Sequence, residues 1–184
     1  MSACGEQQVC IPGLPGQYRK GMKEMAEKNI VVVMGGRSSE HEVSLMSAAT
    51  VIENINTDIY GITKEGQWKL VESVDKIRDG SWVKGHTQAM ISPETGRNEL
   101  CLIQGDKVER LHVDVVFPVL HGMNGEDGTL QGLLELAQIP YVGCGVLGSA
   151  VCMDKIIANR VMDATGIPRC EWDCMERWQR PELA

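Results

Sequence analysis

A run of β-branched residues that ends in two glycines constrains the fold of this chain more than any other feature. The run at 29–34 shows no polar alternation and stops at Gly35 and Gly36. A strand of this kind is buried on both faces, as in a parallel sheet that helices cover on both sides. Residues with helical apolar spacing follow the glycines. This strand, turn and helix predict an α/β fold.

The helix after this first turn has a predicted start and a predicted buried face. Ser39 and Glu42 have the spacing of a capping box, in which each side chain bonds the backbone N–H of the other residue. The apolar positions that follow are three apart, so we expect them to face the core. They are Val43, Met46, Ala49, Ile52 and Ile55.

A second unit of the same kind begins at a buried strand over 113–120. A glycine-rich turn at 121–128 follows the strand and leads into a helix at 129–138. Pro140 stops that helix. The region before this unit, 59–110, is rich in isolated glycines and predicts short strands, turns and one helix.

A third unit begins at a short strand over 141–143. A glycine turn at 143–148 opens a helix at 149–165, and Gly166 is placed to cap its end. A last strand candidate covers 169–175. The three units together predict a three-layer, Rossmann-like α/β domain with a parallel sheet.

The three glycine turns, at 35–39, 121–128 and 143–148, each follow a strand. Ligands of open parallel sheets bind beyond the carboxyl ends of the strands. We therefore expect the turns to gather at one edge of the sheet. That arrangement would bring Glu40, His121 and the start of the last helix close together.

Composition excludes several classes of protein. The chain has 184 residues, is 43% apolar and carries a formal net charge of −7. That apolar content supports a packed core, and the absence of a basic block argues against a nucleic-acid partner. No apolar run approaches the ~20 residues that cross a bilayer, and the first thirty residues lack a signal peptide's apolar stretch. We expect a cytoplasmic protein without membrane contact.

The seven cysteines predict reduced thiols, because their number is odd and no Cys-x-x-Cys occurs. We expect no metal ligand among them. The alternative is a zinc ion held by Cys4, Cys10, Cys170 and Cys174, which lack the usual ligand spacing.

Three side chains at the predicted ligand edge are candidates for binding. Glu40 either interacts favourably with the positive end of its helix dipole or holds a substrate ammonium group. His121 either touches a ligand or bonds the loop backbone. Lys155 is either a solvated surface charge or a phosphate contact.

The turn at 143–148 also has a competing interpretation. It is a literal G-x-G-x-x-G that opens a helix, with Glu171 and Asp173 a little over twenty residues further on. That pattern matches the dinucleotide fingerprint. The motif lies on a late strand, however, and it leaves the other two turns unexplained. An NAD-dependent oxidoreductase is therefore the third hypothesis, and a plain tight turn is the structural alternative.

Three stretches of the chain together resemble the D-alanine–D-alanine ligase family, which is of the ATP-grasp type. They are residues 35–44, 121–132 and 140–155, in that order. The resemblance covers roughly residues 28–170. It implies a pre-ATP-grasp substrate-binding domain at 25–148 and the start of a central ATP-grasp domain at 149–184. Residues 1–24 contain prolines and glycines and show no period, which predicts a flexible leader.

The resemblance also implies a reaction. ATP phosphorylates the carboxylate of one D-alanine, and the amine of a second D-alanine attacks the acyl phosphate to give the dipeptide used in peptidoglycan. Mg²⁺ or Mn²⁺ bridges the phosphates and neutralises their charge. The partners are then D-alanine and ATP, and the full-length enzyme is expected to be a homodimer.

Site roles follow from the same resemblance. Glu40 matches the glutamate that holds the amino group of the first D-alanine, and His121 matches a histidine near its carboxylate. Lys155 matches a lysine that contacts ATP phosphate. The other residues of the expected substrate site are Val43, Ser44 and Gly145.

The family's serine-bearing loop, nucleotide grasp and acidic metal ligands have no counterpart in the chain. We therefore expect a fragment that is inactive by itself and that lacks most of the ATP and metal site. The alternative is a non-catalytic module that binds a small ligand or a partner.

Overall fold

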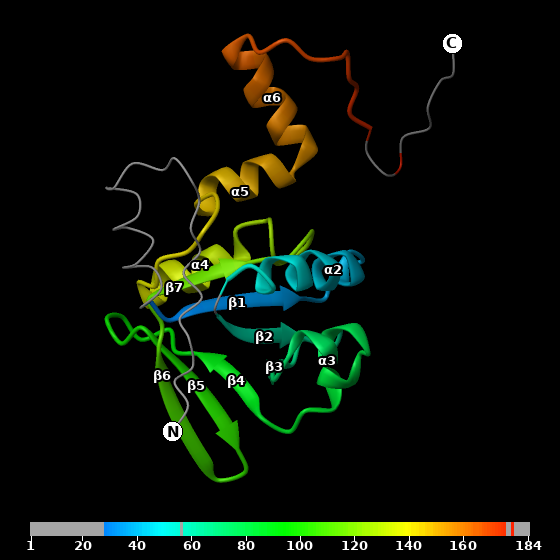
Figure 1. Cartoon of the computed structure of the whole chain (residues 1–184). Coiled ribbons are helices and arrows are strands. Elements are labelled where there is room, and N and C mark those ends of the chain that lie inside the picture. Colours follow the sequence, from blue (N-terminus) through cyan, green and yellow to red (C-terminus); the bar gives the residue numbers. More distant parts are fainter. Residues whose placement is uncertain (1–27, 56, 176–177, 179–184) are drawn as a thin grey trace, which may run out of the picture.

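The computed structural model describes residues 28–55, 57–175 and 178. The leader predicted at 1–24 lies outside these residues. The described part contains a seven-stranded sheet with helices on both faces (Figure 1). None of the helices in this part is long and apolar enough to cross a membrane.

The sheet has the strand order β6-β5-β4-β3-β2-β1-β7. Its strands are β1 (Ile30–Gly35), β2 (Asp58–Ile62), β3 (Trp68–Val71), β4 (Gln88–Ile91), β5 (Glu99–Gln104), β6 (Lys107–His112) and β7 (Val115–Pro118). The helices are α2 (His41–Ile52), α3 (Val74–Arg78), the 3-10 helix η1 (Ser81–Lys84), α4 (Thr129–Ala137), α5 (Val146–Met153) and α6 (Lys155–Thr165).

The sheet is mixed, and only the end formed by β2, β1 and β7 is parallel. Strand β1 pairs in parallel with β2 and with β7, as the predicted strand–turn–helix units require. From β2 to β6, each strand pairs antiparallel with the next one along the chain. The turns after β2 and β5 are too short for the crossover that a parallel pair needs, so these strands form hairpins. The α/β class is confirmed, and the region 59–110 supplies the antiparallel half.

Alternation along β1 divides the interior into two apolar cores. Val31 and Val33 contribute to a core shared with Leu134 of α4. Val32 contributes to a second core on the opposite face, shared with Ala48 of α2. Helices therefore cover both faces of the parallel strands, which confirms the predicted three layers.

The buried face of α2 differs from the predicted one in the first turns of the helix, whereas Ile52 packs against the core as predicted. Val43 and Met46 are 44% and 66% exposed, whereas His41, Ser44 and Ala48 are buried. These three buried positions also have helical spacing, so the apolar pattern alone did not identify the face. Polar contacts orient the helix instead, because His41 bonds to Gly36 and Ser44 bonds to Gly35 at the end of β1.

The predicted capping box is absent. The residue before α2 is Glu40, whose side chain makes no capping bond. Its backbone N–H donates to Ser38 Oγ at 3.0 Å, so Ser38 rather than Ser39 closes the turn. Glu42 forms an ion pair with Lys64 at 2.7 Å, and this hydrogen bond lowers the pKa of Glu42.

The helix predicted at 149–165 is two helices. Asp154 separates α5 from α6 and caps α6 by accepting from the N–H groups of Ile156 and Ile157 at 2.9 and 3.0 Å. Gly166 ends α6 in the left-handed conformation, as predicted. Figure 1 shows α6 standing away from the sheet, and none of its residues is buried.

Two strand predictions are wrong at this end of the chain. The segment at 141–143 makes a single bridge between Tyr141 and Val116 rather than a strand. The segment at 169–175 has no regular structure, because no strand lies beside it to complete its hydrogen bonds. Strand β7 is also shorter than the 113–120 predicted for it.

Candidate functional site

The turn after β1 requires both of its glycines. Gly35 and Gly36 have φ values of +86° and +96°, which side chains rarely adopt. A Cβ at Gly35 would also lie 2.4 Å from the carbonyl oxygen of Ile62. The N–H of Gly36 donates to that same oxygen at 2.8 Å, so the turn is held against the end of β2.

The turn at 121–128 is held by its own side chains. Glu126 Oε2 accepts from the N–H of Gly122 at 2.8 Å, and Gln131 Nε2 donates to the carbonyl of Gly125 at 2.9 Å. Asp127 accepts from the N–H groups of Asn124 and Thr129 at 2.8 and 3.0 Å. The loop therefore presents a defined backbone shape.

Asp127 is ionised in this arrangement. Partial burial acts to raise its pKa, but the bonds from Asn124 and Thr129 outweigh that effect. The pKa of Asp127 is lowered as a result. Its charge lies just before α4 and stabilises the turn.

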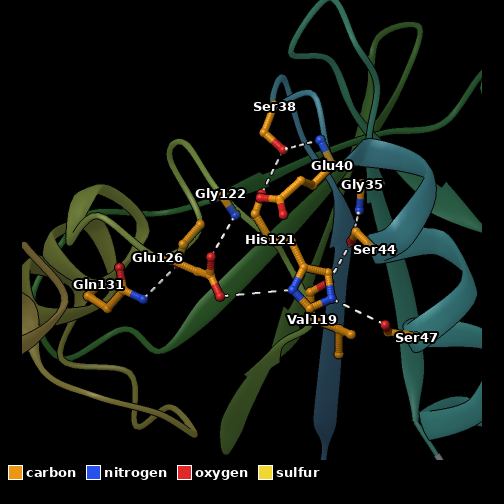
Figure 2. Close-up of polar contacts among 11 residues, drawn as sticks. Gly35, Ser38, Glu40, Ser44, Ser47, Val119, His121, Gly122, Glu126 and Gln131 are labelled. Atoms are coloured by element: carbon orange, nitrogen blue, oxygen red, sulfur yellow. Dashed lines mark hydrogen bonds and ion pairs between the residues drawn. The ribbon is translucent and has the colours of Figure 1, made fainter. Parts of the chain in front are cut away.

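Ser38 joins the two turns. Its hydroxyl donates to the carbonyl oxygen of His121 at 2.7 Å and accepts from the N–H of Glu40 at 3.0 Å (Figure 2). The two residues that it links are 81 positions apart in the sequence (121 − 40). The predicted convergence of Glu40 and His121 at the edge of the parallel strands is therefore confirmed.

The carboxylate of Glu40 lies against the backbone of the second turn. A Cβ at Gly122 would come within 2.5 Å of Glu40 Oε2, and Gly122 has a φ of +70°. The positive φ favours glycine here, and a side chain would also displace the carboxylate. Glu40 is otherwise exposed, so its negative charge is available to a cationic group.

His121 points between two elements rather than into the core. Its Nε2 lies 3.2 Å from Ser47 Oγ on α2, and its Nδ1 lies 3.9 Å from Glu126 Oε1 (Figure 2). Its side chain remains partly exposed. An exposed carboxylate and an imidazole in adjacent turns can bind the ammonium and carboxylate ends of one amino acid.

Ser44, which the family resemblance assigns to the substrate site, is buried and bonded to the backbone. The residue is 0% exposed. Its hydroxyl accepts from the N–H of Gly35 at 2.7 Å and donates to the carbonyl of Val119 at 2.5 Å (Figure 2). Both hydrogen-bonding functions are therefore used to tie α2 to the ends of β1 and β7. Val43, the neighbouring candidate, lies on the exposed face.

The third turn contacts the second. A Cβ at Gly128 would lie 2.9 Å from the carbonyl oxygen of Val146, at the start of α5. Gly145 directly precedes that helix and is exposed. Lys155 lies further along, at the start of α6, where its Nζ donates to the carbonyl of Cys152 at 3.3 Å.

The dinucleotide interpretation of 143–148 does not fit this geometry. That fingerprint requires a strand before the turn and a return strand after the helix. Only the bridge at Tyr141 precedes the turn. Helix α5 leads directly to α6, and no strand follows among the described residues up to 175. The glycines serve as a tight turn into α5.

Three contributors to the site were not predicted from the sequence. Ser38 lies inside the first matched stretch, beside Ser39, to which the capping-box spacing points. The motif therefore contained a serine at the right position for this link. Ser47 and Gly122 carried no signal of their own, because their roles depend on contacts with the other turn. Glu126 supports the site from within the second turn, because it accepts from the N–H of Gly122.

The fold and the clustered turns define an α/β domain whose candidate site lies at the carboxyl edge of its parallel strands. The family model described as D-ala D-ala ligase N-terminus matches residues 29–144. The chain therefore belongs to the D-alanine–D-alanine ligase family.

Individual relatives agree with the family model. A D-alanine–D-alanine ligase of Caldicellulosiruptor bescii is 44% identical over 150 residues, which cover 79% of this chain and 41% of that protein. The solved D-alanine–D-alanine ligase of Coxiella burnetii is 33% identical with a TM-score of 0.73, over 85% of this chain and 47% of that one.

A ligase with a different second substrate in its name is also similar to this chain. The solved VanG D-Ala:D-Ser ligase of Enterococcus faecalis is 44% identical with a TM-score of 0.69, over 76% of this chain and 42% of that one. The chain thus spans less than half the length of each of these three relatives.

Proposed function

We propose that this chain is the amino-terminal, substrate-binding part of an ATP-dependent D-alanine–D-alanine ligase. The enzyme would phosphorylate one D-alanine and join it to a second for peptidoglycan. The observation that carries the proposal is the link through Ser38, which holds Glu40 beside His121 at the ligand edge. Family membership supports the same reaction class.

Glu40 is proposed to bind the ammonium group of the first D-alanine. Its carboxylate is exposed and lies against Gly122, where no side chain blocks an approaching cation. A charged hydrogen bond of this kind contributes about 1.5–3 kcal/mol. His121 is proposed to lie near the carboxylate of the same amino acid, and Gly145 and Val43 to border the site.

ATP and Mg²⁺ or Mn²⁺ are the proposed cofactors. Lys155 is exposed at the start of α6 and is proposed to contact an ATP phosphate. The remaining nucleotide and metal contacts are assigned to regions of the relatives beyond the share that this chain spans. We therefore expect the chain by itself to bind D-alanine without turning over ATP.

The setting of the enzyme is also a proposal. We place it in the cytoplasm, where ATP is available, and we assign it a homodimeric assembly by analogy with the family. The second substrate is D-alanine, D-serine or D-lactate, and the similarity to a D-Ala:D-Ser ligase makes D-serine a relevant alternative to D-alanine.

A titration of the ¹⁵N-labelled chain with D-alanine tests the role of Glu40. We expect shifts at the backbone amides of Glu40 and Gly122, and weaker shifts with L-alanine. Glu40→Gln should weaken D-alanine binding about tenfold or more, because it removes the charge that pairs with the ammonium group.

Glu42→Gln is the matched control, because Glu42 is two positions away and pairs with Lys64 on the surface. This variant should bind D-alanine as the unaltered chain does. Equal responses to D-alanine and L-alanine, or an unchanged affinity in Glu40→Gln, would contradict the proposal.

A further inference from the structure

His41 is a buried imidazole that the proposed binding chemistry does not use. It is the first residue of α2 and is 4% exposed. Its Nδ1 lies 2.7 Å from the carbonyl oxygen of Gly36. Burial of a polar ring is unfavourable unless its polar atoms are bonded, so this contact has a defined structural role.

Trp82, which is distant in the sequence, stacks against the imidazole of His41. It lies in η1, is 2% exposed, and its ring is nearly parallel to that of His41, with centroids 6.2 Å apart and an angle of 15°. The indole occupies the space above Gly61, where a Cβ would come within 2.3 Å of the ring. Gly61 therefore makes room for Trp82, and Trp82 limits the movement of His41.

The other side of the imidazole meets the glycine turn. His41 Cε1 lies 3.1 Å from the position that a Cβ on Gly35 would take. The ring is thus enclosed by Trp82 on one side and by the turn on the other. Its backbone N–H donates to the carbonyl of Ser38 at 3.3 Å, so His41 holds the turn at two points.

We propose that His41 is a positioning residue for Glu40. Its Nδ1–H fixes the carbonyl of Gly36, and the ring held by Trp82 keeps the 35–40 turn in the shape that lets Ser38 reach His121. This inference rests on the proposed function, because it assigns His41 to the same amino-acid site.

The bond defines a tautomer. Nδ1 faces a carbonyl oxygen, which only accepts, so Nδ1 carries a proton in both the neutral and the charged ring. The neutral ring is therefore the Nδ1–H form. A long-range ¹H–¹⁵N spectrum of the unaltered chain reads this directly, and an Nε2–H tautomer for His41 would overturn the proposal.

Two substitutions separate the hydrogen bond from the bulk of the ring. His41→Asn keeps an N–H donor near the position of Nδ1, whereas His41→Leu fills space without a donor. We expect amide exchange at Gly36 and Glu40 to accelerate at least about fivefold in His41→Leu, the equivalent of one lost hydrogen bond. His41→Asn should restore most of the protection.

D-alanine affinity supplies the functional readout. It should fall about fivefold in His41→Leu and stay near that of the unaltered chain in His41→Asn. His112→Leu, at an exposed histidine on the outermost strand β6, is the control and should change neither quantity.

Each outcome bears on one proposal. Unchanged exchange at Gly36 and Glu40 in His41→Leu, or equal damage in both variants, would overturn the role of His41. If His41→Leu does not fold, the tautomer and His41→Asn still decide it. If the unaltered chain does not respond to D-alanine, the proposed function fails, while tautomer and exchange still report on His41.

Discussion

The first glycine turn with α2 and the carboxyl-terminal pair α5 and α6 are built from similar local signals but held very differently. Each has a glycine turn and a helix. Helix α2 buries His41, Ser44 and Ala48 and bonds to two strands. Helix α6 buries no residue, and α5 buries only Ser149.

The difference shows that caps specify where a helix begins and ends, while burial specifies how strongly it is held. Asp154 and Gly166 define α6 as clearly as any element in the chain. Its apolar side chains, such as Ile157 and Val161, are nevertheless about two-fifths exposed. Most helical stability in proteins comes from packing, so we expect α6 to open far more readily than α2.

The largest expected effect is the loss of unfolding free energy on shortening a core side chain, compared with the same change in α6. Leu134→Ala removes a fully buried side chain from the core beside β1 and should cost about 2–5 kcal/mol of unfolding free energy. Val161→Ala in α6 should cost less than about 0.5 kcal/mol. Urea unfolding followed by fluorescence measures both, and similar costs would contradict the comparison.

A second pair of variants compares hydroxyls that bond to the backbone. Ser44→Ala leaves the buried N–H of Gly35 and the carbonyl of Val119 without a partner, at a cost of about 1–3 kcal/mol. Thr165→Val removes a bond to the carbonyl of Val161 that lies in solvent, where water replaces it. The midpoint of unfolding should therefore move in Ser44→Ala only.

The smallest expected effect is on the stability of the fold at acidic pH. The N–H of Asn29, followed by Lys28, lowers the pKa of Asp114, and Arg169 and Trp172 lower that of Asp163. A lowered folded-state pKa contributes stability that is present above the ordinary aspartate pKa and is lost as pH falls through the folded value.

Asp114→Asn should therefore reduce the loss of global stability in acid, because Asp114 joins the starts of β1 and β7. Asp163→Asn should leave global stability unchanged, since its partners lie beyond the packed core. Unfolding midpoints at neutral and acidic pH test both, and a global effect of Asp163→Asn would show that the two regions are coupled.

Several features of the site were accessible from the sequence because they depend on local constraints. Gly35 and Gly36 predicted a turn after the first strand, and the strands before residues 35 and 121 predicted a common edge of the sheet. Glu40 and His121 could therefore be placed near each other. The strand at 169–175 could not be judged in this way, because a strand exists only where a neighbour completes its hydrogen bonds.

The sequence by itself determined the buried parallel strands, the glycine turns and the carboxyl end of α6, because these follow from backbone conformation and from local hydrogen bonds. Only the tertiary structure decided that α2 turns Ser44 inward and Val43 outward, and that Ser38 rather than Ser39 links the two turns. Those choices depend on partners 75 and 83 residues away, whose positions no local pattern encodes.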